Sequence, residues 1–186
     1  QQTELAHMIL DPCTYRACIQ HLARNKKPGP DGIPNELLTA LPDLWHKEIH
    51  RLFCVMWILG RAPACWKLSN TVMLYKKGDP MTPANYRPVG LNNTMGKLWT
   101  AMISSTIAAY AEHHNILSPT QEGFRAHRGT QRQLSYLPRV LEDATVTNQD
   151  LFVAYFDFSS AFNMVDHDKL LCIMYDLGFP ADAIEV

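Results

Sequence analysis

The sequence predicts an α+β fold that is rich in helices and contains few strands. Apolar residues recur at helical spacing over several long stretches, whereas only three short runs are rich in β-branched and aromatic residues. The chain has 186 residues, 47% of them hydrophobic, which is enough to bury a core as one domain or as one lobe of a larger protein. Position 1 is not methionine, and residues 180–186 look like a helix that has only just begun, so we expect an internal fragment.

The N-terminal third is predicted to be helical, with one irregular segment. Asp11 followed by proline is typical of an N-cap and a first helical residue, and this helix is expected to reach about residue 24. Three prolines and two glycines within residues 26–34 exclude regular structure there. A short helix is expected over residues 35–41. A longer one follows over residues 43–59, where large apolar side chains recur at helical spacing and a glycine supplies the stop.

Two β-rich runs, residues 70–75 and 86–91, lie on either side of a Gly-Asp-Pro turn. We expect them to pair as a β-ribbon. Lys76, Lys77 and Arg87 would then lie near the tip of this ribbon.

The C-terminal half is expected to contain three helices and one strand. Helices are predicted over residues 94–113 and 130–146, and a last one over residues 168–177, which a glycine follows. Residues 151–156 form an apolar run that ends at Asp157 and a helical turn. We interpret this run as a buried strand that delivers a carboxylate to its tip.

The net charge of −1 argues against a uniformly basic surface, which is the simplest electrostatic sign of a nucleic-acid-binding protein. The cations are instead clustered in three windows that contain few acidic residues. The windows hold Arg24, Lys26 and Lys27; Lys76, Lys77, Arg87 and Lys97; and Arg125, His127, Arg128 and Arg132.

The five cysteines are odd in number, lie in apolar contexts and form no CxxC pair, so we expect reduced thiols in the core. This favours an intracellular protein, in the cytoplasm, the nucleus or both, and not a secreted one. The longest apolar stretch, residues 52–59, is far too short to cross a bilayer, so no membrane association is expected.

Four separated blocks of the sequence are similar, in the same order, to the reverse transcriptase domain of non-LTR (LINE-type) retrotransposons. One block alone would be a weak signal, but four in the family's order are not expected by chance. The blocks are Lys27–Glu36, Lys76–Asp79 with Asn85–Val89, Gln121–Arg125, and Phe156–Val165 with His167.

The resemblance implies a right-hand polymerase fold, of which this chain would form the helix-rich fingers and part of the palm. Residues 1–68 would be a helical N-terminal extension of the fingers, and residues 69–148 the fingers with their ribbon and helices. Residues 149–186 would be the first palm strand and the following helix. The second pair of catalytic aspartates would then lie beyond residue 186, and the isolated chain is expected to be inactive.

The resemblance also implies a metal site. Asp157 occupies the position of the family's first catalytic aspartate, and the backbone carbonyl of Phe158 is the family's other ligand from this segment. Both would help to hold two Mg²⁺ ions in the complete enzyme. Phe162 matches the aromatic residue that excludes a 2′-hydroxyl and so selects deoxynucleotides. Without the resemblance, Asp157 would be interpreted as an N-cap and Phe162 as a core residue.

Two groups of polar side chains match residues that contact the substrates in the family. Lys77 and Arg87 match the finger residues that hold the triphosphate, whose charge must be neutralised as the site closes. For the others, contacts with the template or with the heteroduplex are expected, and a solvated surface is equally compatible with the sequence. These others are Gln121, Arg125, Arg128, Lys26 and Lys27.

The predicted function is Mg²⁺-dependent deoxynucleotidyl transfer by an RNA-directed DNA polymerase. Its partners would be an RNA template, a DNA primer, a dNTP and the rest of the element's polyprotein, with the remaining palm, the thumb and any accompanying endonuclease. One alternative is a non-catalytic nucleic-acid-binding remnant, with which Asn163 and Ser160 are compatible, since relatives commonly have aspartate and lysine there. Another is a reverse transcriptase of the group II intron maturase type, which residues 28–34 fit less well.

Overall fold

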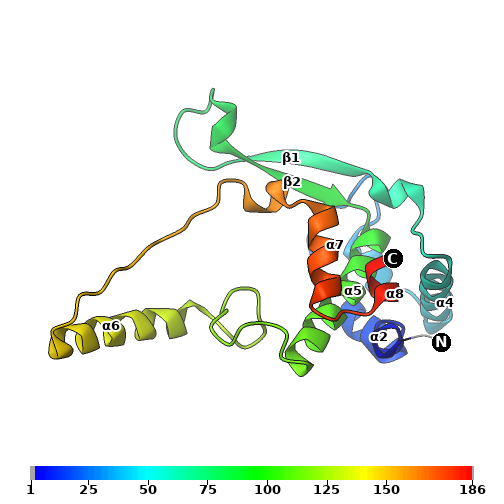
Figure 1. The fold of residues 1–186 in the computed structure, drawn as a ribbon. Coiled ribbons are helices and arrows are strands. Elements are labelled where there is room, and N and C mark those ends of the chain that lie inside the picture. The colour runs from blue at the N-terminus through cyan, green and yellow to red at the C-terminus, as the bar shows by residue number, and fades with distance from the viewer. Residues whose placement is uncertain (1–2, 186) are drawn as a thin grey trace. The chain divides into compact units, whose positions relative to one another are not determined.

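The computed structural model describes residues 3–185 (Figure 1). The chain divides into two compact units. The first comprises the residues up to Ile107 together with the segment from Pro180, and the second comprises Ala108–Phe179. The division falls within helix α5 (Thr94–His113), whose last turns belong to the second unit.

The helices of the first unit begin and end at residues that can cap them. Asp11 accepts a hydrogen bond from the amide of Cys13 (2.6 Å) at the start of α2, as its sequence predicts. Gly60 adopts the left-handed conformation (φ 59°) that ends α4, also as predicted. The helices are α1 (Glu4–Ile9), α2 (Pro12–Gln20), α3 (Asn35–Thr39) and α4 (Asp43–Leu59).

This helical region differs from the sequence-based expectation in two places. Helix α1 is not predicted, because six residues are too few to show a helical period. Helix α2 ends at Gln20 and not near residue 24. The ring of His21 explains this end, since its Nδ1 lies 2.7 Å from the carbonyl oxygen of Ala17 and caps the last turn.

The core of the first unit forms around Phe53 of α4, which is fully buried. Its ring lies edge-to-face with Tyr15 of α2 at a centroid distance of 6.0 Å, and it is tilted against Trp99 of α5 at 5.2 Å. Such aromatic pairs add specific geometry to the burial of apolar surface. The other large, fully buried side chains are Leu5, Ile9, Leu98, Met102 and Thr94.

Strands β1 (Ser69–Tyr75) and β2 (Tyr86–Asn92) pair antiparallel, which confirms the predicted ribbon (Figure 1). Tyr75 pairs with Tyr86 beside the turn, and their rings lie edge-to-face at 5.6 Å. This cross-strand contact stabilises the register next to the tip. Short 3₁₀ helices precede β1 and β2, η1 (Ala64–Lys67) and η2 (Pro83–Asn85) respectively.

The second unit continues from α5 into α6 (Thr130–Thr147), η3 (Ala161–Met164) and α7 (His167–Asp176). Both predicted helices exist within one residue of their expected ends. The side chain of Asp166 accepts a hydrogen bond from a first-turn amide of α7, and Gly178 (φ 86°) follows its C-terminus.

Helix α8 (Ala181–Glu185) belongs to the first unit and follows a proline, as expected for the start of a helix. Asp182 connects it to the N-terminus. The hydroxyl of Thr3 lies 2.8 and 2.9 Å from the two carboxylate oxygens of Asp182, and Thr3 is also the N-cap of α1.

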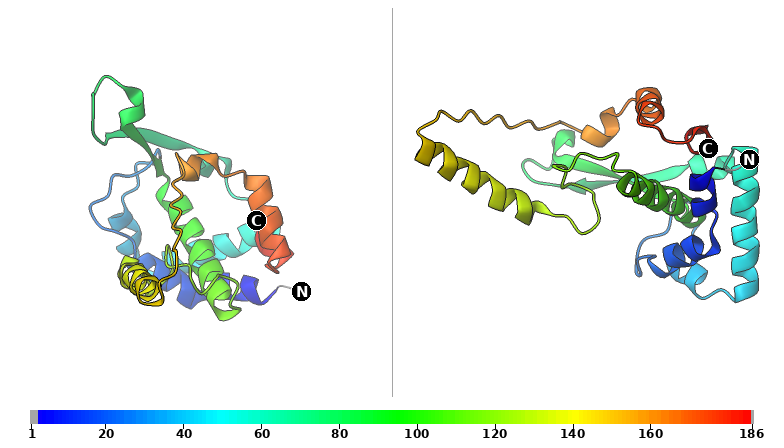
Figure 2. Two further views of the ribbon diagram at one scale, coloured as in Figure 1. Left: turned by 60° about the vertical axis from the view of Figure 1, so that its left-hand side comes forward. Right: turned by 60° about the horizontal axis from the view of Figure 1, so that its bottom comes forward.

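The predicted strand over residues 151–156 is wrong. These residues run as an extended trace between α6 and η3 (Figure 2), and the only sheet formed by residues 3–185 is the β1–β2 ribbon. A strand requires a neighbour that pairs with its amide and carbonyl groups, and no described segment pairs with this run. Phe152, Tyr155 and Phe156 are accordingly 93%, 83% and 85% exposed.

The prediction of core thiols also needs correction. All five cysteines are free, but Cys13, Cys65 and Cys172 are exposed, and only Cys18 and Cys54 are partly covered. Helical neighbours in sequence point in different directions, so an apolar context along the chain does not by itself bury a thiol. Burial raises the pKa of the Cys54 thiol, which keeps it protonated.

Candidate nucleotide and nucleic-acid site

Hydrogen bonds order the loop over residues 76–85 at the tip of the ribbon. The amide of Lys76 donates to the carbonyl of Asn85 (2.8 Å), and the side-chain amide of Asn85 donates to the carbonyl of Asp79 (2.8 Å). Gly78 (φ 95°) turns the chain where a Cβ would lie 2.7 Å from the Asn85 side chain. The tip is therefore a specific turn and not a loose connection.

Lys77 and Arg87 are exposed near this tip, as the sequence predicts. Neither side chain forms an ion pair or a hydrogen bond with any residue that the structure describes. Arg87 pairs with Leu74 in the ladder, so its backbone is fixed while its guanidinium stays free. Two such cations are available to bind a polyphosphate.

The segment over residues 26–34 is anchored on the start of α5. The amide of Asp31 donates to the side-chain oxygen of Asn93 (3.1 Å), and the carboxylate of Asp31 accepts from the amide of Thr94 (3.0 Å). A carboxylate at this place caps the helix and complements its dipole. Sequence reasoning missed this role, because Asp31 and Thr94 are 63 positions apart in the chain.

Lys26 and Lys27 lie at the exposed beginning of this anchored segment. Neither forms an ion pair with a described residue. Beside them, the amide of Asn25 donates to Glu36, and this hydrogen bond lowers the pKa of the Glu36 carboxyl. The two lysines thus carry unpaired charges on a segment that is anchored through the hydrogen bonds of Asp31.

Arg125 organises the loop after α5 in the second unit. Its guanidinium donates to both carboxylate oxygens of Glu112, each at 2.6 Å, and to the carbonyls of Ser118 (2.6 Å) and Gln121 (3.3 Å). Only 6% of the side chain is exposed. The guanidinium predicted to contact the template therefore uses four of its five N–H groups within the chain.

Arg125 and Glu112 shift each other's pKa. The hydrogen bond from Arg125 lowers the pKa of the Glu112 carboxyl, and the carboxylate raises the pKa of Arg125. A carboxylate whose folded pKa is depressed stabilises the fold above its ordinary pKa, and this contribution is lost as the pH falls through the folded value. The pair therefore holds the loop at neutral pH.

Glu122 forms ion pairs with two more arginines, Arg128 of the same loop and Arg132 of the first turn of α6. Its Oε1 lies 3.4 Å from Arg128 and 3.3 Å from Arg132, while Arg128 also donates to the carbonyl of Pro119 (2.8 Å). The Arg128 side chain keeps 22% exposure, so part of its guanidinium faces solvent. Gln121 is exposed, and its side-chain amide lies 3.4 Å from the carbonyl of Gly123.

Asp157 follows the unpaired run and is exposed, as are all the residues between it and η3. Ser160 has a positive φ of 53° and begins the 3₁₀ turn that carries Phe162. The ring of Phe162 is 79% exposed and meets the ring of Phe124 edge-to-face at a centroid distance of 6.0 Å and an angle of 84°. Nothing in the sequence indicates this contact, because 38 positions separate the two residues.

Among residues 3–185, no three histidine, cysteine, aspartate or glutamate side chains come together in a group that could hold a metal ion. The oxygens that this segment offers are the carboxylate of Asp157 and the carbonyl of Phe158. They are hard ligands of the kind that Mg²⁺ accepts, and they would make up part of a site. Within the same described range, no helix is long and apolar enough to span a bilayer.

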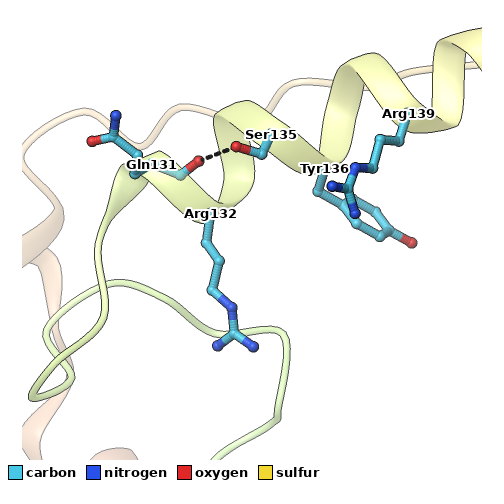
Figure 3. A pocket seen from close by; sticks show the side chains of 5 residues that line it. All are labelled: Gln131, Arg132, Ser135, Tyr136 and Arg139. Carbon is cyan, nitrogen blue, oxygen red and sulfur yellow. Dashed lines mark hydrogen bonds between the residues drawn. The ribbon is translucent and has the colours of Figure 1, made fainter.

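A shallow hollow of about 460 Å³ lies on α6, the helix that follows this loop (Figure 3). Two guanidinium groups, a phenol, an amide and a hydroxyl surround it, with no carboxylate among them. The hydroxyl of Ser135 donates to the backbone carbonyl of Gln131 at 3.0 Å. The lining residues are Gln131, Arg132, Ser135, Tyr136 and Arg139.

Residues 75–185 match a family model described as reverse transcriptase (RNA-dependent DNA polymerase). The match covers more than half of the chain, so the chain belongs to this family. Lys77, Arg87 and Asp157 all fall within the matched residues. Members of the family use divalent metal ions, a nucleic-acid template and primer, and deoxynucleoside triphosphates.

Within the family, the chain is a reverse transcriptase fragment of the LINE-type, non-LTR class, as its relatives show. It is 32% identical over 167 residues to the probable RNA-directed DNA polymerase from transposon X-element of Drosophila melanogaster, covering 89% of this chain and 18% of that protein. It is 29% identical over 164 residues to the probable RNA-directed DNA polymerase from transposon BS of the same species, covering 88% of this chain and 18% of that protein. It is 28% identical over 154 residues to the RNA-directed DNA polymerase from mobile element jockey of the same species, covering 82% of this chain and 17% of that protein. The chain thus spans less than a fifth of the length of these relatives.

Proposed function

We propose that the protein that contains this chain synthesises DNA on an RNA template. The observation that carries the proposal is the match to the reverse transcriptase family over residues 75–185, which includes Lys77, Arg87 and Asp157 in one continuous range. The names of the relatives, which are RNA-directed DNA polymerases of mobile elements, support the same activity. The proposed partners are an RNA template, a DNA primer and a dNTP.

Asp157 is the proposed metal ligand of this chain, together with the backbone carbonyl of Phe158. Mg²⁺ is the proposed ion, and in the complete enzyme a bound pair would activate the primer hydroxyl and neutralise the leaving pyrophosphate. The exposure of Asp157 supports this role, since its carboxylate has no partner among the described residues. The remaining carboxylate ligands would come from the rest of the longer protein.

Lys77 and Arg87 are proposed to bind the triphosphate. Both side chains are exposed and unpaired near the tip of a ribbon whose turn is well ordered. A phosphate contact therefore costs no existing ion pair in the chain. Phe162 is proposed to lie beneath the sugar and to reject a 2′-hydroxyl by steric exclusion.

Lys26, Lys27, Gln121 and Arg128 are proposed to contact the template or the heteroduplex, because each keeps an exposed polar group. Phosphate contacts of this kind give affinity that is independent of sequence and that salt weakens. Arg125 is proposed to act indirectly, since its donors are already bound within the chain.

The functional division of the chain is also a proposal: an N-terminal extension over residues 1–68, fingers over residues 69–148, and the beginning of the palm over residues 149–186. The further palm, the thumb and any endonuclease would belong to the same polyprotein. One relative of 24% identity, from Nasonia vitripennis, is itself named a Pol polyprotein of the retrotransposable element R2.

Asp157→Asn in the full-length protein tests the activity. Primer extension on an RNA template should fall roughly 100-fold or more, because losing a metal ligand removes several kcal/mol of transition-state stabilisation. RNA affinity, measured by fluorescence anisotropy, should be unchanged.

Asp150→Asn is the matched control, because Asp150 is exposed and unpaired seven positions earlier. Synthesis that survives Asp157→Asn would refute the proposed role. RNA binding without synthesis in the unmodified protein would identify a non-catalytic remnant.

A further inference from the structure

The contact between Phe124 and Phe162 gives Phe124 a role that its place in the sequence does not reveal. We propose that Phe124 is a positioning residue that supports the ring of Phe162 and thereby sharpens the discrimination between deoxyribonucleotides and ribonucleotides. The Arg125–Glu112 ion pair would hold Phe124 in place. This inference rests on the proposed function, because the role of Phe162 in sugar selection is itself part of that proposal.

The geometry of the contact is that of a favourable aromatic pair. The ring centroids are 6.0 Å apart, and the ring planes are inclined by 84°. At this distance and angle the positive edge of one ring faces the negative face of the other. Both residues belong to the second unit, and no second ring contact of Phe162 is formed within residues 3–185.

Phe162 needs such support if it is to select sugars. It lies on a single 3₁₀ turn and is 79% exposed, so little else in the chain restricts its side chain. A steric gate rejects a 2′-hydroxyl only if the ring cannot rotate away from it. A neighbouring ring that occupies the space beside it makes that rotation less favourable.

The backbone of Phe124 is arranged to present its ring. The residue has a left-handed φ of 60°, which is disfavoured for any residue with a Cβ, and its side chain is 94% exposed. An exposed aromatic ring in a disfavoured backbone conformation is unusual unless neighbouring contacts enforce it. The hydrogen bonds that enforce this backbone conformation are made by the next residue, Arg125.

Arg125 supplies that enforcement. It follows Phe124 directly, and its guanidinium makes four hydrogen bonds, two of them to Glu112 on α5. The helix thus fixes Arg125, Arg125 fixes the backbone of Phe124, and the ring of Phe124 restricts Phe162. The arginine of this block would therefore affect sugar selection without touching either the nucleotide or the template.

The test is a double-mutant cycle in the full-length polymerase, with kcat/KM measured for a dNTP and for the matching rNTP. Phe124→Leu keeps an apolar side chain but removes the ring edge. We expect it to lower the discrimination ratio about 3- to 10-fold, the range expected from the strength of one aromatic pair. Phe162→Ala should lower the ratio further, and Phe124→Leu should add nothing in that background.

Matched variants separate this role from a general effect on folding. Phe152→Leu changes an equally exposed phenylalanine, 93% against 94%, that makes no ring contact, and it should leave the ratio unchanged. Phe124→Tyr keeps the ring and should retain the discrimination. Glu112→Gln removes the charge that holds Arg125 and should shift the ratio in the same direction as Phe124→Leu.

The outcomes distinguish the inference from the function on which it rests. If Phe162→Ala leaves sugar selection unchanged, the proposed role of Phe162 fails. If Phe162→Ala acts but Phe124→Leu does not, or if the two effects simply add, Phe124 does not support Phe162. If Phe124→Leu weakens RNA affinity while the ratio stays constant, Phe124 stacks on a template base instead.

Discussion

At the scale of single residues, Tyr15 shows how burial sets the charge state of a side chain. Its hydroxyl lies 2.8 Å from Nδ1 of His46, and burial raises the pKa of Tyr15 from the ordinary 10.0 to about 12. Tyr15 therefore stays protonated at neutral pH, and its hydroxyl shares a hydrogen bond with the ring of His46.

Tyr15 should make the free energy of unfolding fall as the pH becomes alkaline. Because its folded pKa lies above its unfolded one, the neutral phenol stabilises the fold below about pH 10, and this contribution is lost as the pH rises to about 12. In Tyr15→Phe the free energy of unfolding should fall less steeply over that interval, and at neutral pH it should be about 1 kcal/mol lower. Urea denaturation at several pH values measures both effects. Tyr136→Phe, at an exposed hydroxyl, is the control, and equal slopes for Tyr15→Phe and the unmodified chain would contradict the argument.

Lys77→Ala tests the nucleotide contact at the same scale. In the full-length protein we expect the KM for dNTP to rise about tenfold, which corresponds to the loss of one charge-assisted hydrogen bond to a phosphate. The affinity for template RNA should hardly change. Steady-state kinetics and anisotropy measure the two quantities, with Lys67→Ala as an exposed control. A larger effect on RNA affinity than on KM would move Lys77 to the template.

The sequence predicts residue roles well where partners are close in the chain. The caps at Asp11 and Gly60 depend on residues within the same turn, and both are correct. The partners of Asp31 and Arg125 lie 63 and 13 positions away, and nothing in their sequence context identifies them. An arginine that contacts solvent and one that is fully bound look alike in a sequence.

At the scale of elements, the helices and the ribbon could be predicted because each shows its own period or turn signal. The run over residues 151–156 has the composition of a strand, and this composition and the family resemblance are the two bases of that prediction. Pairing decides whether a strand exists, and a partner is a property of the fold around it. Helix α1 is the opposite case, since tertiary contacts stabilise a helix too short to have a visible pattern.

The anchoring of the proline-glycine segment can be tested through Gly29. A Cβ at this position would overlap the backbone carbonyl of Asn92 and lie 2.7 Å from the amide nitrogen of Asn93. Backbone atoms cannot move aside as a side chain can, so Gly29→Ala should destabilise the chain by about 2 kcal/mol or more. Gly90→Ala is the control, because its Cβ would meet only side chains at 3.7 and 3.8 Å. Equal melting temperatures for the two variants would show that the segment is not held against β2.

At the scale of the whole molecule, the chain buries a core in its first unit and spans less than a fifth of the length of its relatives. Phe53 is fully buried in the first unit, whereas Asp157 lies in an exposed segment of the second unit. The relatives are more than five times longer than the aligned region, which covers 18% of the first of them. We therefore expect the isolated chain not to extend a primer in the presence of Mg²⁺, and clear extension would show that one aspartate suffices.

Hydrogen exchange should show that residues 151–156 are less protected in the isolated chain than in the full-length protein. In the isolated chain, the amides of residues 151–156 should exchange near the rate of an unfolded peptide, because no partner protects them. The paired amides of β1 and β2 provide the internal reference, and they should exchange more slowly. In the full-length protein the run should become protected. Protection of residues 151–156 equal to that of the ribbon in the isolated chain would mean that the run finds a partner on its own.

The open run Leu151–Phe156 has a practical consequence for anyone who produces this chain. Six successive apolar residues with high β-propensity, no charge and no proline are the hallmark of segments that stack into fibrils. Left uncovered, the run would serve as a template for identical copies of itself. Recombinant material should accordingly precipitate in a concentration-dependent manner, and a single lysine in place of Val153 should keep it in solution.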